Sequence, residues 1–488
     1  MKKKYETLVF VYIFLSIFCS IMLRSLSSLD ELWQYGFGRN IATGILPYKD
    51  MNMIVTPFSM WVLGLFIRLL GEEIYIYRLL GVLVCATAVY ICYKILILLQ
   101  VKKRFVFCMI AYICAFYCVF FTYDYNFLNM TLQVLIIYLY LNRLLCTKAY
   151  WKSDFMLFLT GICSGLPIIT KQTTGLTLMF SSILVYYIIW KKDSAKKKLL
   201  FGIAITLPGV VFFVWLIVNQ ILDDFIFYSV KGLGKFSHKV TLGDFLFRSG
   251  IINTCIGCGT ILICFLVISK IIKNKGRIER NVWIIIFILA MGGMIVIYPI
   301  TDSIHVSVAI FPIILLGILL LADVMNKQSD IRMEVLIFAI FLGLGLPIYI
   351  NIDENSKWSE LKHMKYVLMD RGLEENINKV NDYMERLETD DIYIVDASAC
   401  LYKIPMDMYI KDYDLFLNGH WGTESPLEVV ERLKDREGYI FILKEDYLLN
   451  WQVPKEAVTY VRNEFKKIDE VEQFEVYTCE CSEVLINE

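Results

Sequence analysis

An acidic pair, Asp30 and Glu31, directly follows the first apolar stretch of the sequence. Carboxylates are costly where a helix leaves a bilayer, so ionisable residues at such a point indicate a functional site. The pair opens the segment 29–57, LDELWQYGFGRNIATGILPYKDMNMIVTP, which we expect to hold that site. Asp30 could instead cap a helix that starts at Ser28 or at Asp30 itself. Glu31 should point elsewhere, because neighbours along a helix do not share a face.

Further charged side chains stand at other predicted membrane boundaries: Lys49, Arg78, Asp124, Lys171, Asp302 and His305. Basic residues on the predicted outer side suggest an anion there, although long loops also cross a membrane whatever their charge. Arg78 could simply snorkel to the headgroups. Asp302 with His305 could be a capping pair at i and i+3, and Asp124 a plain turn residue. Lys171, followed by Gln172 and a TTG break between two spans, is the strongest candidate for an anion site.

The composition supports a membrane protein. Of the 488 residues 57% are hydrophobic and only 20% are charged, and the mean hydropathy of +0.58 is too high for a soluble protein of this size. The formal net charge is zero, which gives no indication of nucleic-acid binding. The first apolar run is long for a signal peptide and no small-x-small cleavage site follows it, so we expect a retained helix.

Apolar windows that are long enough to span a bilayer recur about eleven times. They cover residues 6–24, 74–99, 105–122, 128–145, 155–170, 175–190, 199–220, 251–272, 281–298, 307–323 and 333–350. Basic clusters fall on alternate loops, which makes those loops and the N-terminus cytoplasmic. An odd number of spans then places the C-terminal segment outside. The shorter apolar stretch 57–71 should be a helix that lies in the membrane interface.

From residue 351 the composition turns soluble. DIYIVDA and YIFILKEDY have the pattern of strands, and PLEVVERLKDREG between them has the spacing and terminal glycine of a helix. We therefore predict a polytopic α-helical membrane domain over residues 1–350 and a small extracytoplasmic α/β domain over residues 351–488.

Cysteines and histidines give little support for a metal or redox site. Cys255 and Cys258 form a CxxC inside a span, where packing is the simpler explanation. The histidines show no HxxxH or HxH spacing, so we do not expect a zinc site. The sequence does not decide whether a disulfide forms among Cys400, Cys479 and Cys481 of the C-terminal segment.

The order and sidedness of these features resemble the GT-C glycosyltransferases, in particular the bacterial branch related to protein O-mannosyltransferases and to the aminoarabinose transferase of lipid A. The sequence segments that carry the resemblance are Asp30-Glu31, GILPYKD with Pro57, IYRLLG around Arg78, TYDYN with Asp124, KQTTG at 171–175 and YPITDSIH ending at His305. The match covers residues 1 to about 350. Lys49 departs from it, because an arginine is commoner there and a lysine lacks bidentate phosphate geometry.

The resemblance implies an enzyme of the cell membrane. It would move a sugar from a polyprenyl-phosphate carrier to a glycan, lipid or protein acceptor at the outer face, with inversion. Asp30 would be the base that takes the acceptor's proton, next to Glu31, and Asp124 would orient the acceptor or the sugar. The remaining candidates would bind the substrate and its phosphate: Lys49, Arg78, Lys171, Gln172, Asp302 and His305.

A divalent cation, Mg²⁺ or Mn²⁺, would suit carboxylates that meet phosphate oxygens, and Asp30 and Asp124 would be its ligands. The sequence does not decide whether such an ion is needed. Two other classes of function stay open. A flippase or transporter of lipid-linked sugars would need ionisable residues at mid-span and repeated halves, and the sequence has neither. A non-catalytic cell-envelope assembly protein could keep the same fold.

Overall fold

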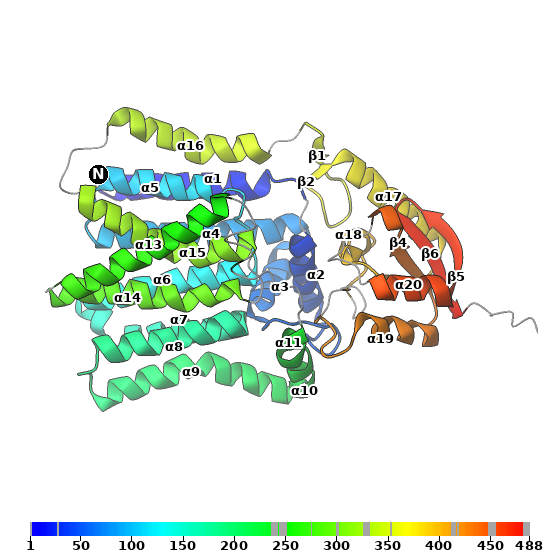
Figure 1. The fold of residues 1–488 in the computed structure, drawn as a ribbon, viewed down its shortest axis with the longest axis horizontal. Coiled ribbons are helices and arrows are strands. Elements are labelled where there is room, and N and C mark those ends of the chain that lie inside the picture. The colour runs from blue at the N-terminus through cyan, green and yellow to red at the C-terminus, as the bar shows by residue number, and fades with distance from the viewer. Residues whose placement is uncertain are drawn as a thin grey trace, which may run out of the picture. The chain divides into compact units, whose positions relative to one another are not determined.

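The computed structural model describes residues 2–26, 29–235, 243, 251–274, 276–298, 302–325, 332–351, 354–410, 416, 419–447 and 455–481 (Figure 1). The chain forms two compact units. Unit 1 comprises Met1–Arg24, Arg78–Trp215 and Lys239–Ile352, and unit 2 comprises Ser25–Tyr77, Leu216–His238 and Asp353–Glu488. Each unit therefore combines segments that are far apart in the sequence.

Unit 1 is a bundle of apolar helices (Figure 1). They are α1 (Lys2–Met22), most of α4 (Ile74–Leu98), α5 (Lys103–Phe116), α6 (Tyr125–Leu145), α7 (Asp154–Thr170), α8 (Gln172–Ile189), most of α9 (Ala195–Val218), α13 (Ile251–Lys273), α14 (Arg277–Gly293), α15 (Ser303–Met325) and α16 (Met333–Asn351), with short 3₁₀ turns η1 (Ala149–Lys152) and η3 (Met294–Ile297). Each apolar window of the sequence corresponds to one of these helices. In the described part of the chain nine helices are long and apolar enough to cross a membrane. The chain is thus a multi-pass membrane protein. The other two predicted spans form shorter helices, namely α5 with 14 residues and α7 with 17.

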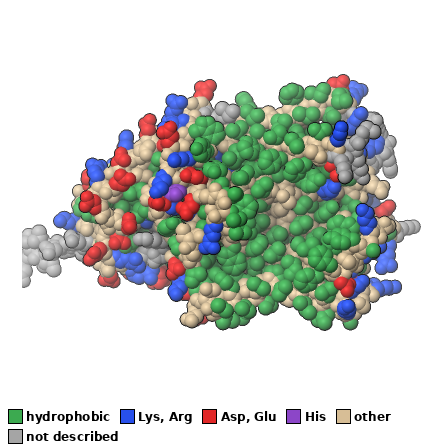
Figure 2. Space-filling view, turned by 180° about the vertical axis from the view of Figure 1, so that it is seen from behind, with side chains coloured by type: hydrophobic (Ala, Val, Ile, Leu, Met, Phe, Trp, Pro, Cys, Tyr) green, Lys and Arg blue, Asp and Glu red, His purple; other side chains and the backbone are tan. Residues whose placement is uncertain are grey.

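Large apolar side chains are exposed on the outside of this bundle, as a lipid environment requires. Figure 2 shows a broad hydrophobic face over the helices. Phe265 and Ile272 on α13 are 69% and 77% exposed, and Phe341 on α16 is 69% exposed. Fully buried aromatic residues such as Tyr117 and Tyr140 fill the interior. The interior is thus apolar as in a soluble bundle, whereas the exposed surface is apolar too and would favour aggregation in water.

Unit 2 begins with a helical pair, α2 (Leu29–Thr43) and α3 (Phe58–Leu70). The predicted helix over 57–71 is therefore present. The helices approach closely at Gly38, where an added Cβ would lie 2.4 Å from the Leu63 side chain. Further along the chain, α10 (Leu222–Phe225), the π-helical turn η2 (Ile226–Gly232) and α11 (Leu233–Lys235) also belong to this unit. The hydroxyl of Ser229 in η2 donates to the Met53 carbonyl at 3.1 Å, which ties this segment to the loop between α2 and α3.

The C-terminal segment contributes an α/β fold to unit 2. Its elements are β1 (Ser356–Trp358), β2 (Leu368–Asp370), α17 (Arg371–Arg386), β3 (Ile392–Ile394), α18 (Ala399–Lys403), α19 (Pro426–Glu431), η4 (Arg432–Asp435), β4 (Tyr439–Leu443), η5 (Glu445–Tyr447), α20 (Lys455–Glu464), β5 (Phe465–Val471) and β6 (Phe474–Cys481). The larger sheet has the order β3-β4-β6-β5, with β3 parallel to β4 and the other pairs antiparallel. The two predicted strands are β3 and β4. The helix predicted between them is α19, which starts with a capping box between Ser425 and Glu428.

The described cysteines form no disulfide with one another. Cys400 and Cys479 are buried thiols in unit 2, whereas the side chain of Cys481 lies outside the described residues. Cys255 and Cys258 are exposed on α13. The described thiols therefore form no disulfide cross-link.

Candidate active site

The first cluster lies in unit 1, where α6 begins. Asp124 caps this helix, because its Oδ1 atom accepts a hydrogen bond from the Phe127 amide at 2.6 Å. Its Oδ2 atom accepts a second hydrogen bond, at 3.2 Å, from the Nδ2 atom of Asn126. Asp124 is buried. Helix capping thus uses the Oδ1 atom, whereas the Oδ2 atom contacts the Asn126 side chain.

Lys171 joins this cluster from the junction between α7 and α8. Its extended backbone, with φ at −153°, ends α7, and α8 begins at the next residue. The Nζ atom donates a hydrogen bond to the Oδ1 atom of Asn126 at 2.8 Å and lies 5.1 Å from the centre of the Tyr125 ring. An amide oxygen and an aromatic face therefore hold the ammonium group in place.

Asp302 and His305 form the pair at i and i+3 that the sequence left open. Asp302 Oδ1 accepts hydrogen bonds from the His305 amide at 2.8 Å and pairs with the His305 Nδ1 atom at 2.9 Å, so it caps α15. The charge of His305 acts on Asp124, and the charge of Asp302 acts on Lys171. Capping and membership of the cluster are therefore compatible, and four predicted site residues lie together.

The cluster shifts the protonation of its members. Burial raises the pKa of Asp124, against the hydrogen bonds from Phe127 and Asn126 and the charge of Lys171. Burial also lowers the pKa of Lys171 to about 8, although Asp124 and Asp302 act in the opposite direction. Burial would raise the pKa of Asp302, but the hydrogen bond and charge of His305 hold it below its ordinary value. The cluster can therefore change its charge close to neutral pH, which is typical of functional sites.

Asn126 is the member that sequence reasoning missed. Its amide joins the two charged groups, since the oxygen accepts from Lys171 and the nitrogen donates to Asp124. It is buried, with 2% of its surface exposed. An uncharged residue in a YDYN turn does not stand out as a candidate, because its partner Lys171 comes from the distant junction between α7 and α8. The signal that could have found it is its position two residues after a predicted site aspartate.

Arg78 and Gln172 complete the predicted residues of unit 1. Arg78 is 1% exposed and donates through Nη1 to the Arg24 carbonyl at 2.6 Å. Arg24 in turn donates to the Cys118 carbonyl at 2.9 Å. Such burial does not fit the snorkelling alternative, because the guanidinium stays inside the unit. Gln172 is the first residue of α8 and directly follows Lys171.

The other predicted site residues, Asp30, Glu31 and Lys49, belong to unit 2. Asp30 and Glu31 stand in the first turn of α2, with Asp30 exposed and Glu31 buried. They face different ways, as expected for neighbours on a helix. Ser28, the alternative helix start, lies outside the described residues. Lys49 is exposed in the loop that follows α2.

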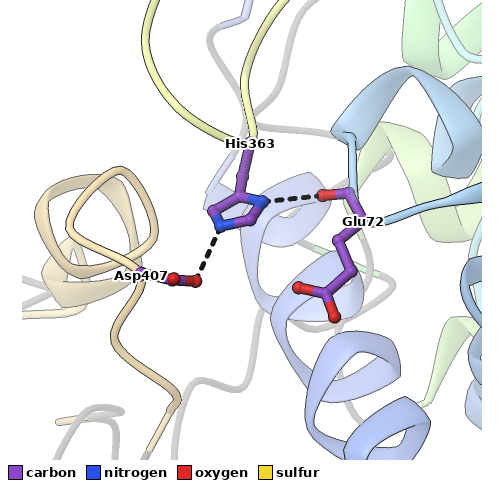
Figure 3. A group of neighbouring side chains, drawn as sticks. All are labelled: Glu72, His363 and Asp407. Carbon is purple, nitrogen blue, oxygen red and sulfur yellow. Dashed lines mark hydrogen bonds and ion pairs between the residues drawn. The ribbon is translucent and has the colours of Figure 1, made fainter.

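One group in unit 2 has the composition of a metal site. Glu72, His363 and Asp407 each offer a ligand atom, and these atoms lie within 4.8 Å of one another (Figure 3). It is the group that meets this criterion among the described residues. The His363 Nδ1 atom lies 3.1 Å from the Glu72 carbonyl oxygen, and its Nε2 atom lies 2.7 Å from Asp407 Oδ1. The sequence does not predict it, because the three residues share no motif.

The ligand atoms of this group already contact a cation, the guanidinium of Arg39. Arg39 Nε donates to Glu72 Oε2 at 3.2 Å, and Nη2 donates to Asp407 Oδ1. The same Nη2 atom lies 3.2 Å from His363 Nε2. A divalent ion held by these residues would need the space and the charges that Arg39 now uses, so the group as it stands does not fit a metal.

No family model matches the chain, and no curated protein matches it either. Among solved structures, the chain is similar to ArnT from Cupriavidus metallidurans bound to undecaprenyl phosphate, with a TM-score of 0.64 and 11% identity over 99% of each chain. The apo state of ArnT gives a TM-score of 0.63 and 12% identity over 98% of each chain. AglB, an archaeal oligosaccharyltransferase from Archaeoglobus fulgidus, gives 0.47 and 11% over 91% of this chain and 70% of that chain. The fold comparison depends on ArnT, and it confirms the predicted polytopic helical fold with a C-terminal α/β domain.

Proposed function

We propose that this chain is a membrane glycosyltransferase that moves a sugar from a polyprenyl-phosphate carrier to an acceptor at the outer face of the membrane. The observation that supports the proposal is the proximity of Asp124, Lys171, Asp302 and His305 in unit 1, where two acidic and two basic side chains interact. Support also comes from the likeness in fold to ArnT, whose crystal structure contains undecaprenyl phosphate.

In this proposal the acceptor hydroxyl attacks the anomeric carbon of the sugar and gives its proton to the Asp30 carboxylate. The bond between that carbon and the carrier phosphate breaks, and the phosphate leaves with the bonding electron pair. Lys171, with His305, stabilises the charge that builds on the phosphate oxygens. A single displacement inverts the anomeric configuration.

The remaining residues take supporting roles. Asp124 orients the sugar or the acceptor, and Glu31 stands beside the base. Arg78, Gln172, Lys49 and Asp302 contribute to substrate and phosphate binding. With the N-terminus in the cytoplasm, the C-terminal α/β segment lies outside the membrane. A divalent ion at Asp30 and Asp124 stays a prediction, and a metal is not needed for the step as written.

The decisive experiment replaces Asp30 by asparagine. Removing a general base of similar shape should lower the rate of sugar transfer by about 10²- to 10⁴-fold without affecting expression. The rate is measured as release of polyprenyl phosphate from a panel of polyprenyl-phosphate sugars, with the purified chain in lipid nanodiscs.

Asp382→Asn provides a matched control, because this aspartate is exposed on α17. It should leave the rate unchanged. Normal transfer by Asp30→Asn would exclude Asp30 as the base. A wild-type chain that turns over none of these donors but moves them between leaflets would instead support the transport alternative.

A further inference from the structure

The group of Glu72, His363 and Asp407 surrounds a buried arginine. Arg39 is 1% exposed, and every nitrogen of its guanidinium has an acceptor or ligand atom nearby. Nε donates to Glu72, Nη1 donates to the Met408 carbonyl at 3.1 Å, and Nη2 donates to Asp407. The guanidinium is thus held on all sides within its own plane.

The face of the guanidinium is covered as well. The central carbon of Arg39 lies 4.6 Å from the centre of the Tyr409 ring, in the geometry of a cation–π contact. A buried charge is tolerated only where opposite charges and hydrogen bonds surround it. Two carboxylates supply them here, and Lys362 neutralises part of Asp407 through a bond of 2.7 Å to its second oxygen.

The orientation of His363 is that of a metal ligand. A backbone carbonyl can only accept a hydrogen bond, so the Nδ1 atom facing the Glu72 carbonyl carries a proton. The Nε2 atom faces Asp407 and Arg39, so it is the ring nitrogen on the side where an ion in place of the guanidinium would lie. Metal-binding histidines are commonly fixed in this way, with the second nitrogen donating to a carbonyl. The backbone at His363 and Asp407 is also held at positive φ, 61° and 66°.

We propose that Arg39 occupies a latent divalent-cation site: its guanidinium fills the place that Glu72, His363 and Asp407 would otherwise offer to a metal ion. Both an arginine and a divalent ion satisfy two carboxylates, but the arginine is part of the chain and cannot be removed by dilution or chelation. The wild-type chain therefore takes no metal at this point. Loss of the guanidinium leaves two carboxylates and an oriented imidazole, which is a set of ligands that suits Zn²⁺ or Co²⁺.

Arg39 also connects separate segments of unit 2. A metal ion could do so only while it stayed bound. Arg39 connects α2 with the turn before α4 at Glu72, with the loop at His363 and with the loop at Asp407 and Met408. These segments all belong to unit 2 and are far apart in the sequence. The guanidinium therefore fixes α2, the helix that carries Asp30, independently of any metal in the surroundings.

Co²⁺ alone is the probe that tests this proposal, using the full chain in nanodiscs after treatment with a chelator. The wild type and the control Arg68→Ala should show no visible absorption from bound Co²⁺ at this site. Arg68 is a suitable control because it lies in the same unit and bonds only to the carbonyls of Ile41 and Ala42 among its described contacts. Arg39→Ala should bind one equivalent of Co²⁺, with visible bands that lack thiolate charge transfer, which excludes binding to the free cysteines.

The double variant Arg39→Ala/His363→Ala should bind Co²⁺ at least about tenfold more weakly than Arg39→Ala. The Tm of Arg39→Ala should also rise with added Co²⁺, and that of the double variant should not. If Arg39→Ala is too unstable to purify, Arg39→Gln keeps more of the volume and takes its place. Stoichiometric Co²⁺ in the wild type that depends on His363 would overturn the proposal, as would a folded Arg39 variant with no affinity for Co²⁺.

Discussion

Lys171 and Asn126 show how an uncharged residue can link two charged ones. The Asn126 amide presents its oxygen to the ammonium and its nitrogen to the Asp124 carboxylate. The bond from Asn126 lowers the pKa of Asp124, against the effect of burial. A hydrogen bond accepted from the Lys171 ammonium favours the charged form of that group in the same way. The amide therefore helps to keep Lys171 protonated and Asp124 ionised near neutral pH.

This linkage predicts the pH dependence of sugar transfer. If phosphate binding needs protonated Lys171, the rate falls as the pH rises through about 8. If Asp124 acts as a carboxylate, the rate also falls on the acid side, at a higher pH than for an ordinary aspartate, because its pKa is raised. Asn126→Ala removes a bond from each charged form, so each limb of the pH–rate profile should move inward by about one unit.

The measurement is the rate of transfer against pH for the wild type and Asn126→Ala. Asn142→Ala is the control, because Asn142 is a buried amide at the other end of α6 whose Nδ2 atom donates to the Tyr138 carbonyl. It should leave both limbs in place. A lower rate in Asn126→Ala with an unchanged profile would mean that the amide has only a structural role.

Residues at span ends could be selected as candidates from their charge, their predicted side of the membrane and the family resemblance. Asp124, Lys171 and His305 lie near one another because the helices of a bundle bring their equivalent ends together, and their role in a site stays a prediction. Sequence reasoning failed for the contacts of Arg39 with Glu72 and Asp407. Those partners are 33 and 368 residues away and come from loops, so no local period connects them.

At the scale of elements, the junction of α7 and α8 sets the position of Lys171. The two helices approach so closely at Gly175 that an added Cβ would lie 2.1 Å from the Pro167 carbonyl oxygen and 2.3 Å from the Ile168 Cα atom. These are backbone atoms, which cannot turn aside as a side chain can. The glycine of the KQTTG motif is therefore explained by packing rather than by contact with a substrate.

Gly175→Ala should accordingly push α8 away from α7 and displace Lys171 from Asn126. We expect a loss of about 1–3 kcal/mol in stability, typical of overpacking, together with weaker phosphate binding. Gly202→Ala in α9 is the matched control, since an added Cβ there meets no atom within 4 Å. Thermal unfolding in detergent compares the two variants, and equal Tm values would contradict the packing argument.

The helices themselves were predictable because a long apolar run has few alternatives in a membrane. The C-terminal strands and α19 were predictable for another reason, namely their alternating or amphipathic patterns and the capping residues at Ser425. The composition of unit 2 was not predictable. It combines α2 and α3 with the C-terminal sheet through contacts such as the bond from the Trp33 ring nitrogen to the Ala397 carbonyl at 2.8 Å.

At the scale of the whole molecule, unit 2 depends on its C-terminal segment. Asn40 on α2 donates through Nδ2 to the Ile410 carbonyl at 2.6 Å and accepts from the Ile410 amide at 3.2 Å. A chain that ends at residue 351 would leave the Asn40 amide without Ile410. The Arg39 guanidinium would keep Glu72 but lose its partners from the C-terminal segment, and such losses are costly for buried polar groups.

We therefore expect the chain truncated at residue 351 to reach less than about a tenth of the normal level in membranes, since unfolded segments are degraded. Quantitative immunoblotting of an N-terminal tag measures this level. A chain that ends at residue 481 retains every described element and serves as the control. Equal amounts of the two truncated proteins would show that α2 and α3 are stable without the sheet.

Because unit 2 consists of three separate segments, its parts are synthesised at different times. Ser25–Tyr77 leave the ribosome early, whereas β6, the last strand of the sheet, ends at Cys481. The membrane helices are thus synthesised before the C-terminal partners of Arg39, the arginine on α2 that is buried in the folded protein. The fold of unit 2, and with it the position of α2, can therefore be completed only after β6 has been synthesised.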